Sequence, residues 1–401
     1  MNHIYASSYL TIAATCSLDS TGGLFRKASL KHIAHQLPAV KEEELYVRAP
    51  LDHPEVFGLR PPLLERAWVL REQICSTRVL HFLEDEVAWE CNSRRTCECR
   101  GWEESSESSN RLKGFTNSLA NHPPITIEDV GNYTWAFHGV IKQFSNRAIT
   151  YPTNRLPASA AFAKSLLPIM PGGYFAGHRD AAMPADLIWT CNRNSLKSRP
   201  REYIAPTWSW ASMNAPVGWR ELEPENTLLI ANVLEVKCEP LYDNYCLQVS
   251  NGYLIIEAPS LEAKYSSLNR GITIVDRSSD SGEISPGSFL PDYALETQDK
   301  YHVEDRETLY LLAISSCHNP KGRSMLLLVV KEVPGVKDEF WRIGLCTSYE
   351  LDRAEDSWED FWDPGGYFAY NPSKEIAEQR AFYKRFLEVV NSAERKALKI
   401  V

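Results

Sequence analysis

Apolar and polar positions near the start of the chain predict a strand followed by a helix. Residues 9–14 form the short apolar run Tyr-Leu-Thr-Ile-Ala-Ala, which is typical of a buried strand. After two prolines at positions 61 and 62, apolar side chains recur at helical spacing, at Leu63, Ala67, Leu70 and Ile74. We therefore expect an amphipathic helix with proline near its first turn.

Two further apolar runs follow that helix. They occupy residues 78–82 and 87–91 and flank the acidic residues 84–86. This arrangement predicts two strands joined by a turn. The order strand, helix, strand indicates an α/β layer.

The middle of the chain changes from polar to helical. Residues 103–110, Glu-Glu-Ser-Ser-Glu-Ser-Ser-Asn, offer no apolar side chain for burial, which predicts a mobile, exposed loop. Residues 133–144 and 156–167 have the composition of helices, and Pro171-Gly172-Gly173 interrupts the pattern. We expect a mostly helical middle segment.

Beyond Pro206 the chain becomes rich in β-branched and aromatic residues, which predicts a β-rich domain. The expected strands are residues 227–236, 245–249, 253–258, 309–314, 325–333 and 340–346. Asn251-Gly252 lies between two of these runs, as a hairpin turn does.

A late helix is predicted at residues 372–392, with Asn371 as its N-cap and Pro372 as its first residue. A final strand is expected at residues 397–401. The whole pattern predicts a mixed α+β and α/β fold in three parts, which are residues 1–102, 103–200 and 201–401.

Composition narrows the classes of function. The formal net charge is −9, and no long basic run is present, which argues against a nucleic-acid or anionic-membrane surface. No signal peptide and no apolar run long enough to span a bilayer is found, so we expect an intracellular protein. Its ten cysteines are then expected to be reduced thiols.

Four ordered blocks of sequence carry a resemblance to a known family. They comprise residues 4–14 with 19–24; residues 66–72 with 78–82 and 89–91; residues 174–178 with 186–189 and 205–212; and residues 340–345 with 398–401. Together they resemble the fungal heterokaryon-incompatibility (HET) family. The resemblance implies a role in nonself recognition and regulated cell death.

The resemblance covers only the later part of the HET domain. The aromatic strand with a Trp-Gly turn, and the following strand with an Asp and a Cys, have no counterpart before residue 4. We therefore expect residues 1–102 to form a partial α/β layer like that of TIR domains, without activity of its own. The implied partners are proteins, including other copies of the chain.

An enzymatic alternative depends on Trp68 and Glu72. HET domains have been considered distant relatives of TIR domains, whose NAD-cleaving members place a catalytic Glu four residues after a Trp. Trp68 and Glu72 have that spacing, and NAD would then be the substrate. A carboxylate there would stabilise the positive charge that develops as nicotinamide leaves. The alternative is that Trp68 fills a core and Glu72 is an ordinary surface or ion-paired carboxylate.

Cysteines gather between the tryptophans at 89 and 102. Cys91, Cys97 and Cys99, with His81 or Cys75, are candidates for a zinc site. The spacing lacks the paired knuckles of structural zinc sites, so reduced, partly buried thiols are the default interpretation.

A third hypothesis is a protein-binding module. The β-rich domain would supply the surface, together with the acidic stretch at residues 350–363. Trp208, Trp210 and Trp219 are expected to fill the core of this domain rather than to line a ligand groove.

Overall fold

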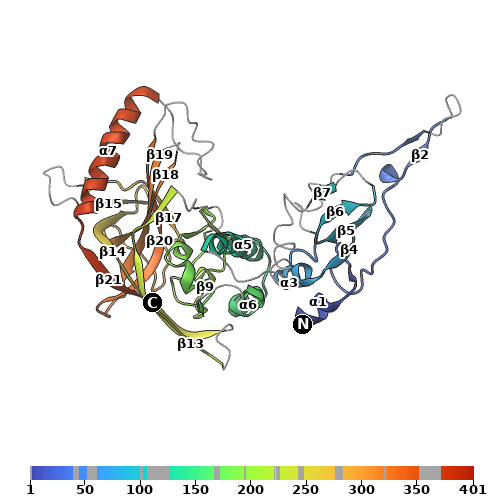
Figure 1. The fold of residues 1–401 in the computed structure, drawn as a ribbon, viewed down its shortest axis with the longest axis horizontal. Coiled ribbons are helices and arrows are strands. Elements are labelled where there is room, and N and C mark those ends of the chain that lie inside the picture. Colours follow the sequence, from blue (N-terminus) through green and yellow to red (C-terminus); the bar gives the residue numbers. More distant parts are fainter. Residues whose placement is uncertain are drawn as a thin grey trace. The chain divides into compact units, whose positions relative to one another are not determined.

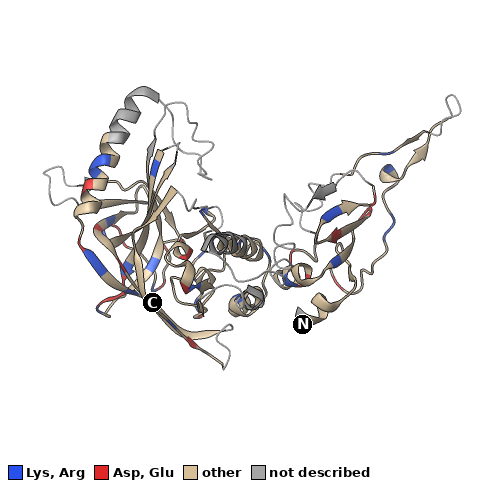
Figure 2. Cartoon of the chain, in the orientation of Figure 1, with Lys and Arg blue, Asp and Glu red and all other residues tan. Residues whose placement is uncertain are grey.

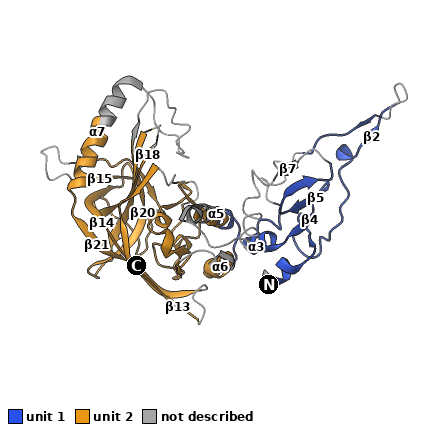
Figure 3. Ribbon diagram, viewed as in Figure 1, with its two compact units in different colours: residues 1–126, 143–150, 164–169 blue, residues 127–142, 151–163, 170–401 orange. Residues whose placement is uncertain are grey.

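The computed structural model describes residues 2–38, 45–51, 61–99, 103–105, 127–166, 172–193, 196–220, 222, 226–242, 248–275, 283–319, 322–351 and 372–401. The chain forms two compact units (Figure 3). Unit 1 comprises residues 1–126, 143–150 and 164–169, and unit 2 comprises residues 127–142, 151–163 and 170–401. The expected mixed α/β class, with a β-rich later part and a late helix, is confirmed.

Unit 1 contains a five-stranded sheet in the order β1-β4-β5-β6-β7 (Figure 1). Its strands are β1 (Thr11–Ala13), β4 (Arg78–Phe82), β5 (Val87–Cys91), β6 (Arg94–Cys97) and β7 (Glu103–Ser105). β1 runs parallel to β4, and the other pairs are antiparallel. Helix α3 (Ala67–Cys75) contacts α1 (Asn2–Ser7). A short hairpin of β2 (His35–Gln36) and β3 (Tyr46–Val47) follows the 3-10 turn Leu30–His32.

The strands at 78–82 and 87–91 are confirmed with the expected bounds. The buried strand expected at residues 9–14 is wrong in its environment, because β1 is an edge strand and Ile12 is 56% exposed. The helix begins at Ala67, since the prolines at 61 and 62 open a hydrogen-bonded turn instead. The loop expected at 103–110 begins with strand β7, which pairs with β6; residues 106–110 lie outside the described part.

Unit 2 begins with helices and short strands and continues into a large sheet. The first elements are α5 (Ile127–Ser145), α6 (Arg155–Leu166), β8 (Tyr174–Phe175), β9 (His178–Arg179), β10 (Trp189–Cys191) and β11 (Val217–Trp219). The expected helices at 133–144 and 156–167 are thus confirmed, the first with a longer N-terminal part.

The large sheet of unit 2 has ten strands, in the order β12-β18-β19-β20-β21-β14-β15-β16, with β13 beside β14 and β17 beside β20. The strands are β12 (Thr227–Leu229), β13 (Asn232–Pro240), β14 (Val249–Ser266), β15 (Gly271–Val275), β16 (Glu283–Ile284), β17 (Ser288–Pro291), β18 (Thr308–Asn319), β19 (Gly322–Glu332), β20 (Glu339–Leu351) and β21 (Arg395–Ile400). β14 also pairs with β18, so the strand pairings return to β14 and enclose an apolar core.

Helix α7 (Pro372–Ser392) packs against β20 and β14. Tyr383, Phe386 and Val390 are buried in this contact, as the apolar spacing predicts. The helix and the final strand β21 are confirmed, whereas the N-cap Asn371 lies outside the described residues.

The hairpin expected at Asn251-Gly252 is wrong. Both residues lie inside β14, opposite Glu239 and Cys238 of β13, so the strand continues through them without a turn. The Gly252 N–H donates to the Asn251 side-chain oxygen at 2.8 Å. A Cβ atom on Gly252 would lie 2.7 Å from Cγ of Pro206. Glycine is therefore required at this position by close packing rather than by a turn.

Charged residues of the described segments are mixed in sign. Figure 2 shows Lys and Arg scattered among Asp and Glu along the elements of each unit. None of the described helices has both the length and the apolar character that crossing a bilayer requires.

Candidate functional site

The two residues of the enzymatic hypothesis lie on helix α3. Trp68 and Glu72 are both half-buried, and their spacing places them on one side of the helix, one turn apart. Burial and then the neighbouring Glu72 carboxylate, through a hydrogen bond and its charge, raise the pKa of the Tyr5 hydroxyl of α1. Glu72 is thus partly accessible and has a phenol beside it.

A buried polar chain lies on the other side of α3, between the helix and the sheet. Oγ1 of Thr15 lies 3.0 Å from Nδ1 of His81, and Nε2 of His81 lies 3.0 Å from Oε2 of Glu90. Gln73 donates to the same carboxylate at 2.8 Å, and Arg95 lies 3.4 Å from its other oxygen. A hydroxyl, imidazole and carboxylate in this order are also found in nucleophilic enzymes.

Burial indicates whether these hydrogen-bonded side chains are catalytic or structural. Thr15, His81 and Glu90 keep at most 1% of their surface exposed, so no substrate reaches the hydroxyl in this conformation. The hydrogen bonds join β1, β4 and β5 through side chains that would otherwise be buried without partners. We interpret these hydrogen-bonded side chains as structural groups that stabilise the sheet.

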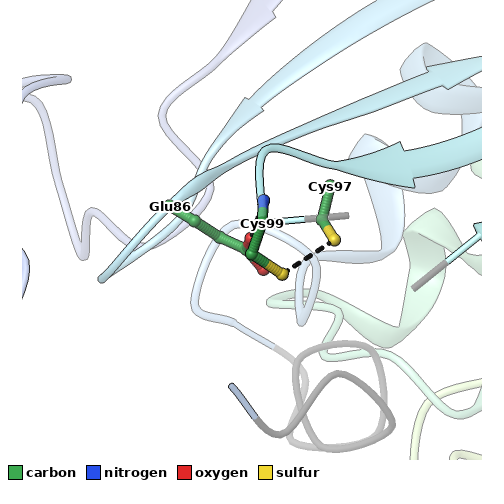
Figure 4. A group of neighbouring side chains, drawn as sticks. All are labelled: Glu86, Cys97 and Cys99. Carbon is green, nitrogen blue, oxygen red and sulfur yellow. Dashed lines mark hydrogen bonds between the residues drawn. The ribbon is translucent and has the colours of Figure 1, made fainter. Parts of the chain in front are cut away.

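The structure divides the predicted zinc ligands between the two faces of the sheet. Cys97 and Cys99 lie together, with sulfur atoms 3.1 Å apart, and the third member of their group is Glu86 rather than Cys91 or His81 (Figure 4). Cys91 projects from the opposite face of β5, since side chains alternate along a strand. His81 is held by Thr15 and Glu90.

Cys91 and Cys75 have different environments. Burial raises the pKa of Cys91, but hydrogen bonds from Ser93 and the backbone outweigh it and lower that pKa to about 7. Burial raises the pKa of Cys75, which ends helix α3. Cys91 is therefore the more reactive thiol of the two.

One face of the unit 1 sheet carries a group of apolar side chains that the described residues do not completely cover. The strand registers align Ile12 with Leu80 and Leu80 with Trp89, so these three side chains project from the same face. Phe82 and Val87 lie on that face as well. Leu80, Phe82, Val87 and Trp89 are half-buried, and Ile12 is exposed. Among the described residues, Phe25 is the aromatic that contacts this face, with its ring edge-on to Phe82 at 5.6 Å. We call Ile12, Leu80, Phe82, Val87 and Trp89 the open face.

The third and fourth blocks of the resemblance meet in the core of unit 2. Arg342 of β20 is fully buried and binds Asp292 with two hydrogen bonds, of 2.8 and 3.1 Å. Its guanidinium lies 3.6 Å from the ring centroid of Trp189, and it donates to the backbone oxygens of Leu187 and Trp189. Trp189 in turn donates to the backbone oxygen of Trp208 at 2.9 Å. Segments distant in sequence are thus joined around one cation.

The expectation that tryptophans fill this core is confirmed for two of them. Trp208 and Trp210 are fully buried, whereas Trp219 is half-buried. Trp219 stacks on the imidazole of His138, with centroids 4.2 Å apart and planes 5° from parallel.

Asp186 joins two histidines beside these tryptophans. Its carboxylate lies 2.6 Å from Nε2 of His138 and 3.6 Å from Nδ1 of His178. Burial raises the pKa of Asp186, but the charge and the hydrogen bond of His138, together with the nearby imidazole of His178, outweigh it and hold that pKa well below its usual range. Burial lowers the pKa of His178, whose Nε2 accepts a hydrogen bond from the backbone N–H of Trp210. This accepting nitrogen identifies His178 as a neutral imidazole.

Sequence patterns gave only weak indications of several polar groups that the structure brings together. Asp186, His178 and Arg342 fall within resemblance blocks, but nothing in their spacing predicted the contacts between them. Glu86 stood in an acidic turn and was assigned no chemistry. The acidic stretch of the binding hypothesis, beyond residue 351, lies outside the described residues.

Comparisons of the chain with protein-family models, with curated proteins and with solved structures gave no match. The candidate sites therefore have to be interpreted from their own geometry.

Proposed function

We propose that the chain is a heterokaryon-incompatibility-type protein that acts in fungal nonself recognition and regulated cell death through protein contacts, without chemistry of its own. The class rests on the four sequence blocks, which resemble that family in order. The mode of action rests on one observation, which is the open face of the unit 1 sheet. A group of neighbouring apolar side chains that stays half-exposed is typical of a surface that contacts another protein.

The occupant that we propose for the open face is a second copy of the chain. The five residues of the open face carry no charge, so they can pack against their own image without a complementary charge. The strand registers place Arg78 and Arg94 on the same face, at the margin of these five residues. Elsewhere, the net charge of −9 opposes association of two copies. β1 also ends the strand order of its sheet, so its outer edge has no strand partner among the described residues.

Sedimentation velocity of the full chain over a range of concentrations tests this proposal. The wild-type chain is expected to dimerise, and Ile12→Lys is expected to raise the dissociation constant at least about tenfold, because it would bury a charge in the contact. Leu268→Lys is the matched control, since Leu268 is 97% exposed and belongs to unit 2. A chain that stays monomeric, or an Ile12→Lys variant that dimerises like the wild type, would contradict the proposal.

A second candidate function is NAD cleavage with Glu72 as the catalytic carboxylate. What favours it is that Glu72 and Trp68 are both partly accessible on one side of α3. Release of nicotinamide from NAD by the purified chain is the assay, with Glu72→Ala as the test variant. Glu65→Ala is the control, because Glu65 is an exposed carboxylate just before the same helix. Activity that survives Glu72→Ala removes Glu72 as the catalyst.

A further inference from the structure

Three potential metal ligands meet at the open end of the β5–β6 hairpin. The pairing of Ala88 with Cys97 continues through a hydrogen bond from the Glu98 N–H to the Val87 oxygen. Glu86 is two residues before Ala88, and Cys99 is two residues after Cys97. Glu86 and Cys99 thus lie just outside the paired strands, where the chain brings their side chains together with Cys97.

The ligand atoms are close enough to bind one ion. One carboxylate oxygen of Glu86 and the sulfur atoms of Cys97 and Cys99 all lie within 4.8 Å of one another, and Figure 4 shows the carboxylate beside the two sulfurs. With bonds of about 2.3 Å to sulfur and about 2.1 Å to oxygen, a tetrahedral zinc ion holds its sulfur ligands about 3.8 Å apart. The sulfurs, now 3.1 Å apart, would separate by less than about 1 Å.

We propose that Glu86, Cys97 and Cys99 bind a zinc ion, with the fourth coordination position open to water. Two thiolates and one carboxylate suit zinc, whereas calcium and magnesium prefer oxygen ligands alone. Binding releases the two thiol protons to solvent. Three anionic ligands and one Zn²⁺ leave a net charge of −1. The guanidinium of Arg48 lies nearby, since it donates to the Cys99 backbone oxygen at 2.9 Å.

A backbone group already orients one of the ligands. The N–H of Cys99 lies 3.3 Å from Oε2 of Glu86, so the carboxylate is oriented towards the cysteines before any metal binds. Glu86 and Cys97 are buried, and Cys99 is half-buried. The site is thus reachable by an ion from one side and shielded from bulk water on the other.

Titration of the reduced full chain with Co²⁺ alone tests the site, because cobalt bound by thiolates gives a charge-transfer band in the near ultraviolet. We expect one Co²⁺ per chain, displaced by Zn²⁺. The band should disappear in the Cys97→Ser, Cys99→Ser double variant, and Glu86→Gln should weaken binding at least about tenfold. Cys91→Ser and Glu98→Gln are the matched controls, and both should bind like the wild type.

A measurement on the wild-type chain guards against variants that fail to fold. Zn²⁺ is expected to slow alkylation of Cys97 and Cys99 at least about tenfold, as located by peptide mapping, and to leave Cys91 unaffected. Absence of the cobalt band in the wild type, or its persistence in the double variant, overturns the proposal. Oxidation of Cys97 and Cys99 to a disulfide in air, in a chain that binds no cobalt, also overturns the proposal, since the two cysteines would then be a redox pair.

Discussion

Unit 2 buries its largest aromatic side chains around a cation in its core, whereas unit 1 leaves apolar side chains exposed at the edge of its sheet. In unit 2, Trp189, Trp208 and Trp210 are fully buried around Arg342. In unit 1, Tyr9 is 81% exposed and Ile12 is 56% exposed, both at the edge of the sheet. The difference lies in how the two units treat their aromatic and apolar side chains next to the sheets, and the contact proposed above uses the exposed ones of unit 1.

The largest effect is expected from Arg342→Met, which removes the cation that joins the core segments of unit 2. Asp292 would remain buried with only its longer pair of 3.6 Å to Arg199, so we expect a loss of about 3 kcal/mol in the free energy of unfolding. Urea unfolding followed by tryptophan emission measures it. Lys399→Met is the control, since its pair with Glu339 is part-exposed and should contribute less than about 1 kcal/mol. Equal losses in the two variants would refute the central role of Arg342.

A smaller effect is expected from Gly177→Ala in unit 2. Gly177 has a φ of +95°, and a Cβ atom there would lie 2.5 Å from Nε1 of Trp210, so the substitution combines backbone strain with a clash. We expect a loss of more than about 2 kcal/mol by the same urea unfolding. Gly335→Ala measures the backbone strain without the clash, because Gly335 has a φ of +77° and no atom within 4 Å of an added Cβ. Equal losses would show that the Trp210 contact is unimportant.

The stability of unit 2 is expected to depend on pH through His178. Burial holds its pKa below the ordinary value of about 6.5, so the folded chain binds fewer protons than the unfolded chain as pH decreases. The contribution of neutral His178 to the free energy of unfolding is therefore complete above about pH 6.5. It is lost as the pH falls towards the pKa of His178 in the folded chain. Asp186, whose pKa is also lowered, adds a second loss below about pH 3.9. His178→Gln should flatten the unfolding curve between pH 7 and 5, and an unchanged slope would contradict this assignment.

The smallest effect is expected in the alkylation rates of one cysteine thiol from each unit. The pKa of Cys91 in unit 1 is lowered to about 7, whereas burial raises that of Cys346 in unit 2 to about 12. Alkylation of Cys91 should therefore increase with pH around a midpoint near 7, and Cys346 should react only after unfolding. Mass spectrometry of peptides after timed labelling measures both rates. A midpoint for Cys91 near the pKa of an ordinary thiol would contradict the lowering of its pKa by Ser93.

The sequence predicted elements well wherever one pattern dominates the local structure. Strands β4 and β5 and helix α7 have the expected bounds, because apolar periodicity and a proline at the helix start act over a few residues. Gly252 misled the prediction, since its role is close packing against Pro206 from a distant segment. The exposure of β1 was also hidden, because an apolar run does not reveal how many neighbours a strand has.

The candidate sites were less predictable than the elements. Cys97 and Cys99 were predicted as zinc candidates together with Cys91, whereas Glu86 joins them only through the β5–β6 hairpin. His81 had the right chemistry for a metal ligand and is instead engaged by Thr15 and Glu90. A ligand set assembled by strand pairing depends on register and on which face each side chain occupies, and spacing along the chain determines neither.

The position of β21 has a consequence for synthesis of the protein on the ribosome. β21 lies between β20 and β14 and pairs with both, although β14 is translated long before it. The gap in the sheet therefore cannot be filled until residues 395–400 have left the exit tunnel. At typical elongation rates of about 5–20 residues per second, β14 would wait several seconds for this neighbour. During that interval its unpaired edge is exposed to chaperones and to other nascent chains on the same messenger RNA.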